Sequence, residues 1–380
     1  MSNIKDSGGR GTVAQAGAHE RPLTPGVPPG REVAGTATLA EAGGATTAGI
    51  APLARLRGFH PGWFGAVMGT AIVGVAAAMN PGQIASLAPA ARTLGQVMAV
   101  LAAALAVVLA VPYLGRFVLH RDAALADLRD PVAGALYGTL PGGILVLAAT
   151  AAAVGPTLLP APAVRDLVAS LDWVGVPLAF AISVVFAYLL FLRSELVPET
   201  VNGGWFIPPV VNIVVPLVLV PLVHGSSPAT ARALLLASYG FWGMGFLLYL
   251  LIVTMLHHRL VLHPLPHAGL APSLWIGLGP IGVGALALVK MAAAGTSVFG
   301  PLGPTVALGS RLAATALWGF GVWWLAVAAL LLLHYLRSGP LPYGIGWWGF
   351  TFPLGAYTVA TMTLAQSWPP SLRVSRCSCT

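Results

Sequence analysis

The feature that most constrains this chain is the near-absence of charged side chains from long stretches of it. Apart from Arg116 and Lys290, which lie near stretch ends, nine mostly apolar stretches contain no Asp, Glu, Lys or Arg. A membrane-spanning helix needs about 20 consecutive, mostly apolar residues. The sequence therefore predicts nine spans, at 61–79, 94–118, 133–153, 173–192, 205–223, 233–256, 273–291, 312–335 and 346–366.

Composition excludes a water-soluble enzyme. Only 8% of the residues are charged and 57% are hydrophobic, whereas soluble domains carry about 25% charged residues. The expected fold class is an all-α polytopic membrane protein. The net charge of +8 comes from Lys and Arg scattered through the connecting segments without a run of three. Such scattering is typical of charges that set membrane topology, and it does not indicate a nucleic-acid-binding surface.

The two ends of the chain differ in composition from the apolar part. Residues 1–57 are rich in Gly, Ala, Thr and Pro, which predicts a disordered tail without a signal peptide. A transmembrane transport domain is expected over 58–366, followed by a polar tail over 367–380. The two Cys of the chain, Cys377 and Cys379, lie in that tail and indicate no disulfide framework.

The odd-numbered stretches repeat at intervals of 68 to 73 residues and differ from the even ones. Four of them carry Pro in their first halves, at Pro141, Pro208, Pro209, Pro280 and Pro353, and the first has Gly69 and Thr70 instead. The even stretches are smoother and bulkier. A proline within a helix kinks it and frees a carbonyl, which membrane proteins tolerate only against protein or water. The pattern predicts helical hairpins with five irregular inner helices around a narrow central pore. The alternative is that the glycines serve only close helix packing, as in Gly65-x-x-x-Gly69 and Gly134-x-x-x-Gly138.

Four segments of the chain resemble a known family. They read PGWFGAVMGTAI, WFIPPVVNIVVP, LGPIGVGALAL and GWWGFTFPLGAYTVAT. Over residues 58–366 the chain resembles the tellurite-resistance/dicarboxylate transporter family. This family includes yeast malate and sulfite permeases and the slow-type anion channels of plant guard cells. The resemblance implies ten helices in five hairpins around a pore, commonly as a homotrimer in the plasma membrane. It also implies a gate formed by a Phe of the ninth helix, which corresponds to Phe352, with Phe350 as the second candidate.

The chain departs from that family after the ninth stretch. In place of a tenth helix it reads AQSWPPSLRVSRCSCT, which is too polar to span a bilayer. Either the tenth helix is absent or the chain is a truncated or frameshifted product, and both explanations stay open.

The chemistry of the predicted pore follows from what its spans contain. Their central parts lack Asp, Glu and His, which argues against proton coupling and against the acidic ring of a cation channel. The polar side chains that remain are Thr70, Thr139, Asn212, Thr351 and Thr358. They suit a weakly bound anion, or they form ordinary hydrogen bonds between helices. An aromatic ring such as Phe352 can block ions by filling and dewetting a constriction, although a packed core aromatic is the alternative.

The favoured function is therefore an anion channel or facilitative transporter without a metal, a cofactor or catalytic residues. Its partners are expected to be small anions of the dicarboxylate, sulfite, chloride or nitrate class. A coupled secondary exporter of malate or sulfite is the first alternative. A membrane metalloenzyme is the second, based on a histidine-rich loop that comprises His257, His258, His263 and His267. Such enzymes need several histidine boxes with carboxylates, and Pro264 and Pro266 disrupt helical alignment of these residues.

The distribution of basic residues predicts a cytoplasmic N-terminus. Eight Arg fall on the N-terminal side of the predicted spans: Arg55, Arg57, Arg116, Arg121, Arg129, Arg193, Arg259 and Arg337. Five basic residues fall on the other side: Arg92, Arg165, Arg232, Lys290 and Arg311. Loops rich in Lys and Arg stay in the cytoplasm.

Overall fold

The fold is built from helices throughout residues 55–80 and 83–368, the ranges that the computed structural model describes. Nine long helices occur there: α2 (Phe64–Ala78), α3 (Ala88–Leu119), α6 (Thr139–Val154), α7 (Ala161–Phe191), α8 (Ile207–Val223), α9 (Pro228–Leu262), α10 (Leu278–Val298), α11 (Gly303–Ser338) and α12 (Trp348–Ser367). Each overlaps one of the nine predicted stretches, and the outer helices α3, α7, α9 and α11 begin earlier than predicted. The tails predicted over 1–57 and 367–380, and with them the question of a tenth helix, fall almost entirely outside the described residues.

Eight of these helices, within the described ranges, are long and apolar enough to cross a membrane. The all-α polytopic fold class is thereby confirmed. The ninth helix, α12, is missing from that set although its 20 residues form one helix. Four Thr, two Gly and one Gln lower its hydropathy, and its position between other helices explains why such a composition is tolerated.

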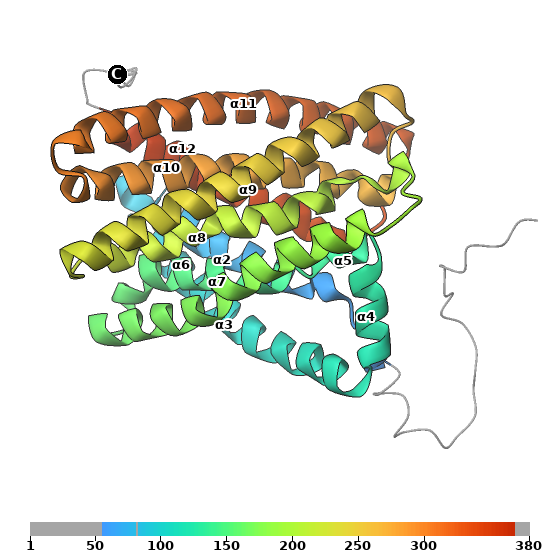
Figure 1. Ribbon diagram of the computed structural model, residues 1–380, viewed down its shortest axis with the longest axis horizontal. Coiled ribbons are helices and arrows are strands. Elements are labelled where there is room, and N and C mark those ends of the chain that lie inside the picture. The colour runs from blue at the N-terminus through green and yellow to red at the C-terminus, as the bar shows by residue number, and fades with distance from the viewer. Residues whose placement is uncertain (1–54, 81–82, 369–380) are drawn as a thin grey trace, which may run out of the picture. The chain divides into compact units, whose positions relative to one another are not determined.

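The contacts between helices form a closed ring. In order around the ring, α2, α6, α8, α10 and α12 each contact the next, and α12 contacts α2. The other four helices pack on the outside: α3 on α2 and α6, α7 on α6 and α8, α9 on α8 and α10, and α11 on α10 and α12. Figure 1 shows that the axes of the long helices lie roughly along one line of the picture, while the short helix α4 (Arg121–Arg129) lies across them. The expected arrangement of hairpins with inner and outer helices is present.

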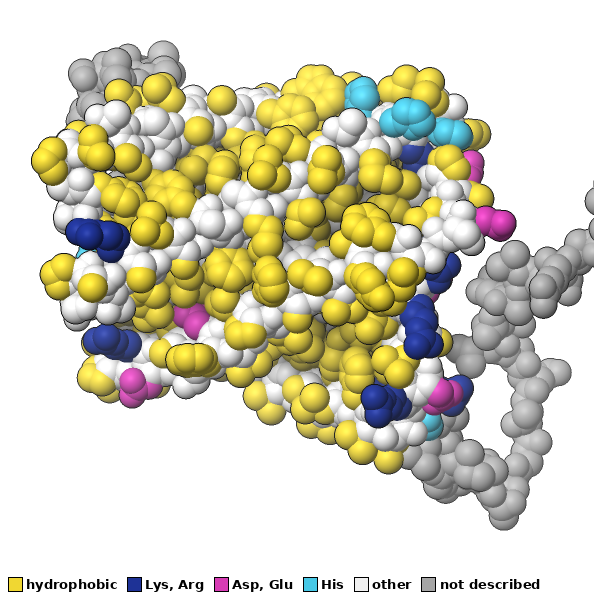
Figure 2. All heavy atoms as spheres, in the orientation of Figure 1, with side chains coloured by type: hydrophobic (Ala, Val, Ile, Leu, Met, Phe, Trp, Pro, Cys, Tyr) yellow, Lys and Arg dark blue, Asp and Glu magenta, His cyan; other side chains and the backbone are white. Residues whose placement is uncertain are grey.

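Burial separates the two kinds of helix. In the most apolar stretch of α2, α6, α8 and α10, 67–83% of the residues are buried, against 11–28% in α3, α7, α9 and α11. Figure 2 shows that hydrophobic side chains cover the middle of the visible face and that Lys and Arg gather towards its two ends. An apolar belt with basic side chains towards its two ends is the surface that a bilayer favours.

The inner helices are irregular at their beginnings. Short 3₁₀ turns precede four of them: η1 (Pro61–Trp63), η5 (Gly203–Phe206), η6 (Ala268–Gly277) and η8 (Ile345–Trp347); the short helix α5 (Ala133–Leu136) precedes α6. Four of the predicted kink residues lie in the first α-helical turn and not mid-helix: Pro141, Pro208, Pro209 and Pro280. A proline in the first turn has no backbone N–H that would otherwise go unpaired. These prolines therefore mark where each α-helix begins, whereas Pro353 lies inside α12 as expected.

Two ion pairs hold the short helix α4 against the segment before α2 and against the end of α3. Arg57 pairs with Asp122 at 2.5 Å, and the buried Arg116 pairs with Asp127 at 2.6 Å. The hydrogen bond from the Arg57 guanidinium lowers the pKa of the exposed Asp122 carboxyl. These residues belong to the group predicted to face the cytoplasm, and that orientation stays a prediction.

Close packing of α10 against α12 depends on Gly282. A Cβ atom at this position would lie 2.7 Å from the backbone N and 2.8 Å from the Cα of Tyr357. Since backbone atoms cannot yield without moving a helix, we expect Gly282→Ala to lower the free energy of unfolding by about 1–3 kcal/mol. Thermal unfolding in detergent measures this effect, with Gly319→Ala in α11 as the control because nothing lies within 4 Å of a Cβ there. Equal stability of the two variants would contradict the prediction.

Candidate functional site

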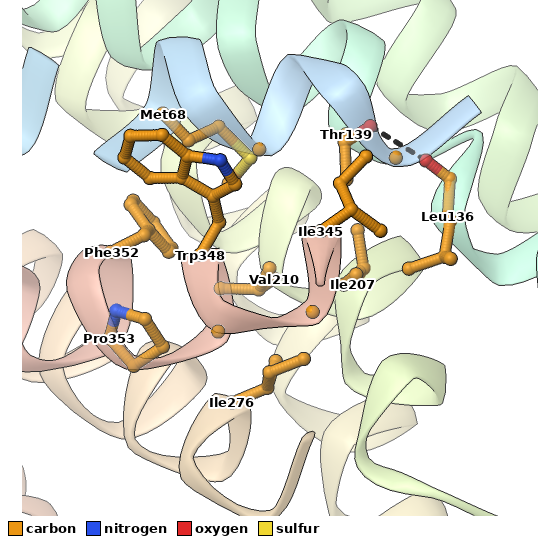
Figure 3. Close-up of a pocket in the computed structure, with 14 residues that line it drawn as sticks. Met68, Leu136, Thr139, Ile207, Val210, Ile276, Ile345, Trp348, Phe352 and Pro353 are labelled. Atoms are coloured by element: carbon orange, nitrogen blue, oxygen red, sulfur yellow. Dashed lines mark hydrogen bonds between the residues drawn. The ribbon is translucent and has the colours of Figure 1, made fainter. Parts of the chain in front are cut away.

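Two cavities lie on the axis of the ring, and each is lined by residues of all five inner segments. The wide cavity, of about 490 Å³, lies towards the C-terminal ends of the inner helices, where Met79, Thr150, His224, Lys290 and Thr363 are among its lining residues. The narrow cavity, of about 80 Å³, lies where these helices begin. Figure 3 shows the narrow cavity with Met68, Trp348 and Phe352 at one end and Leu136, Thr139 and Ile345 at the other.

Phe352 is the one described residue that lines both cavities. Its side chain is 5% exposed. It reaches from α12 towards α10 and α8, because a Cβ at Gly279 would lie 3.6 Å from its Cε1 and 3.7 Å from Cγ2 of Val210. These are ordinary van der Waals distances, so the ring packs directly against α10 at Gly279. The aromatic ring thus stands between the two cavities.

Phe350 lies elsewhere. Its ring packs against Trp275 at a centroid distance of 5.4 Å and against Trp347 at 5.9 Å, and it lines neither cavity. The two candidate gate residues therefore occupy different environments, and only Phe352 faces the axis.

The remaining predicted pore residues divide into two groups. Thr139 and Pro353 line the narrow cavity. The Thr139 hydroxyl donates to the carbonyl oxygens of Leu136 at 2.7 Å and Pro61 at 3.0 Å. The other group is buried or packed between helices and lines neither cavity: Gly69, Thr70, Pro141, Pro208, Pro209, Asn212, Pro280 and Thr351.

Asn212 shows why the second group differs from the expectation. Its Nδ2 atom donates to Ser183 Oγ at 2.9 Å and to the Ala179 carbonyl at 3.4 Å, both on the outer helix α7. It holds two helices together, as the hydrogen-bonding alternative predicted. Gly69 likewise serves helix packing, since a Cβ there would lie 2.6 Å from Trp348 and 3.3 Å from Thr351.

Sequence reasoning missed the polar residues of the wide cavity. Lys290 and His224 are exposed and line it, and Thr150 and Thr363 add hydroxyl groups. A signal was available, because Lys290 is one of two Lys in the chain and follows a long run of apolar residues. A fixed cation that lines a cavity raises the local concentration of anions there.

The direction of the inner helices also affects the electrostatic potential along the axis. All five run the same way, because an outer helix returns the chain after each of the first four. Their N-terminal ends surround the narrow cavity, and the partial positive charge of helix N-termini favours anions. Their C-terminal ends surround the wide cavity, where the charge of Lys290 offsets the partial negative charge.

His60 caps the first of these N-terminal ends. The backbone N–H of Gly62 donates to its Nδ1 at 3.1 Å. Burial lowers the pKa of His60, with Asp127 acting in the opposite direction. Burial thus favours the neutral imidazole, which is the form that can accept this bond.

The beginning of the fourth span differs from the expectation. The fourth span was predicted to begin at residue 173, but α7 begins at Ala161 and contains Asp172. Asp172 is 6% exposed, and neither carboxylate oxygen has a hydrogen-bond partner. The helix extends further because apolar Val164 and Val168 continue its buried face before Asp172. The fourth span therefore begins earlier than predicted and includes one buried acidic residue, which directly precedes the predicted stretch 173–192.

The histidines do not form the predicted loop. His257 and His258 belong to helix α9, and His263 caps it. The rings of His258 and His263 lie 6.0 Å apart, and His263 Nδ1 is 3.7 Å from a Glu199 oxygen. In the part of the chain that the structure describes, no group of three or more His, Cys, Asp or Glu could hold a metal ion. The metalloenzyme alternative gains no support from these residues.

Comparison with known proteins shows a family and several relatives to which this chain is similar. The family described as voltage-dependent anion channel matches residues 58–378. An uncharacterized transporter of Methanocaldococcus jannaschii is 33% identical over 307 residues, which cover 80% of this chain and 83% of that protein. A sulfite efflux pump of Trichophyton rubrum is 28% identical over 323 residues, or 82% of each chain. A malic acid transport protein of Schizosaccharomyces pombe is 25% identical over 207 residues, which cover 52% of this chain and 46% of that protein.

Proposed function

Because this chain belongs to the voltage-dependent anion channel family, we propose that it passes small anions across a membrane along the axis of its five inner helices. It acts as a channel or facilitative transporter. The observation that carries this proposal is the pair of cavities on the axis that meet at Phe352. An anion entering from either side reaches the same aromatic ring.

In this proposal Phe352 is the gate. Its ring separates the cavities and is surrounded by apolar side chains such as Met68 and Val210. A narrow apolar constriction blocks ions because water leaves it and the hydration shell is lost. Anions pass when the ring turns aside.

The charge pattern supports anions over cations as the transported species. Five helix N-termini surround the narrow cavity and Lys290 faces the wide one, while no Asp or Glu is among the described residues that line either cavity. The names of two relatives, a sulfite efflux pump and a malic acid transport protein, support sulfite and C4-dicarboxylates within the wider class that includes chloride and nitrate.

The setting of the protein is part of the same proposal. The apolar belt and the multi-pass fold suit a plasma-membrane protein, and the basic residues favour a cytoplasmic N-terminus. The exposed apolar faces of α3 and α7, with Val111 70% and Phe191 84% exposed, suit lipid or the neighbours in a homotrimer.

Reconstitution into liposomes tests the function. Purified protein is sealed into vesicles with gradients of chloride, nitrate, sulfite or malate, and a potential-sensitive dye reports the ion that crosses. We expect potentials of the sign set by anions and none with impermeant gluconate on both sides. Potentials that follow the potassium gradient would contradict the proposal.

A coupled secondary exporter of malate or sulfite is the second candidate. The observation that favours it is Asp172, an acidic residue buried within a membrane-spanning helix. Such residues commonly mark proton pathways in transporters.

A further inference from the structure

We propose that Asp172 is a proton-binding site whose occupancy controls anion binding in the wide cavity. This inference rests on the proposed anion transport and adds to it a residue outside both cavities. Asp172 lies on an outer helix, and the expected gate and cavity-lining residues do not include it.

Asp172 lies inside α7 and not at either end of the helix. It is the twelfth residue of a 31-residue helix, or about 17 Å from the helix start at 1.5 Å per residue. The hydrocarbon core is about 30 Å thick. A charge in the interior of this layer is costly unless it is paired or neutralised.

The side chain of Asp172 faces the ring of inner helices and not the lipid. Its neighbour Trp173 is 82% exposed, whereas Asp172 is 6% exposed. On the same face of α7, Gly175 packs so closely against α6 that a Cβ would lie 2.7 Å from Leu145, and the Ala179 carbonyl accepts a bond from Asn212 of α8. Asp172 therefore lies behind the seam between α6 and α8, two helices whose inner sides line the wide cavity.

Within the described ranges, no side chain donates a hydrogen bond to the Asp172 carboxylate or forms an ion pair with it. Both oxygens are buried. The elements in main contact with α7 are α6, α8, α4 and η3 (Gly155–Thr157). Of these, α6, α8 and η3 contain no titratable side chain. The four charged residues of α4, namely Arg121, Asp122, Asp127 and Arg129, lie near the opposite end of α7, where Arg193 donates to the Arg129 carbonyl. On α7 itself, Arg165 and Asp166 are exposed one and a half turns or more away, and Tyr188 is more distant.

The consequence for anions follows from Coulomb's law. Packed helix axes lie about 8–10 Å apart, so an ionised Asp172 stands roughly that far behind the cavity wall. At an effective dielectric constant of ~20, a like charge at about 10 Å weakens anion binding roughly tenfold. Proton binding removes this repulsion, and by linkage the anion strengthens proton binding by the same factor.

Anion flux at symmetric pH tests the inference. Liposomes carrying the full chain are assayed with low, subsaturating chloride at symmetric values from about pH 5 to about pH 9, a range that buried acids can span. We expect the wild-type flux to fall roughly tenfold with rising pH and the flux of Asp172→Asn to lose that dependence. Asp166→Asn, the same change at an exposed position of the same helix, is expected to behave as wild type. A pH dependence that Asp172→Asn retains, or a wild-type flux independent of pH, would overturn the proposal.

Infrared difference spectroscopy supplies a readout independent of transport. A carbonyl band of a protonated carboxylic acid is expected in the wild type at acidic pH, lost at alkaline pH and absent from Asp172→Asn. If no anion crosses wild-type membranes, the proposed function fails, and this band still decides whether Asp172 binds a proton. A wild-type spectrum without that titrating band would refute the proton site.

Discussion

Phe352→Ala is expected to raise anion flux through liposomes on the order of a hundredfold, which corresponds to a barrier lowered by about 2.7 kcal/mol. The ring stands between the two cavities and lines both. Truncation to a methyl group joins the cavities and lets water continue along the axis, so the dewetting barrier disappears. Flux is measured by anion-selective electrode or potential dye at equal protein density.

The matched control is Phe350→Ala, two residues away on α12. Phe350 packs against Trp275 and Trp347 and lines neither cavity, so its truncation leaves the barrier in place. Because truncating a buried Phe typically costs about 3–5 kcal/mol, both variants must first elute as folded protein and show a cooperative thermal transition. A folded Phe352→Ala with wild-type flux would remove this residue as the gate.

The architecture of the ring was predictable from the sequence for a physical reason. Lipid demands about 20 apolar residues per span, and only helices shielded from lipid tolerate repeated Pro and Gly. These two requirements make inner and outer helices distinguishable in the sequence, because only the inner ones repeat Pro and Gly. The buried fractions of the helices agree with this distinction. The exact role of the prolines could not be read in the same way. Pro280 looks mid-span in the sequence, yet it lies in the first turn of α10 because the preceding ten residues form a 3₁₀ helix.

The candidate site was only partly predictable. Phe352 was reached through the family resemblance, since the sequence alone does not show which of two nearby rings faces the axis. Asn212 was misplaced because its partner, Ser183, comes from another helix whose rotation the sequence leaves open. The sequence did not indicate a role for Asp172 or Lys290 for a common reason. Each lies at the edge of a predicted apolar stretch, 173–192 or 273–291, whereas α7 and α10 extend beyond those edges.

Lys290→Glu is expected to lower anion flux about thirtyfold at low salt. The substitution changes the charge facing the wide cavity by two units, and one unit at about 4 Å is worth about 1 kcal/mol in bulk water. Since Lys290 is exposed, mobile ions screen the effect, and it should shrink to a few-fold as ionic strength rises and the Debye length falls to about 3 Å at 1 M. Lys290→Gln, which removes one unit, is expected to lie between wild type and Lys290→Glu.

The control for Lys290→Glu is Arg232→Glu, which changes the net charge equally. Arg232 is exposed near the beginning of the outer helix α9 and does not line either cavity. If the field of Lys290 acts on anions inside the wide cavity, Arg232→Glu lowers flux far less and both effects weaken with salt. An equal loss from the two substitutions would mean that overall charge, and not the cation facing the cavity, sets the anion supply. A Lys290→Glu effect that persists unchanged at high salt would instead point to direct, desolvated contact between the ammonium group and the passing anion, since only buried pairs escape screening.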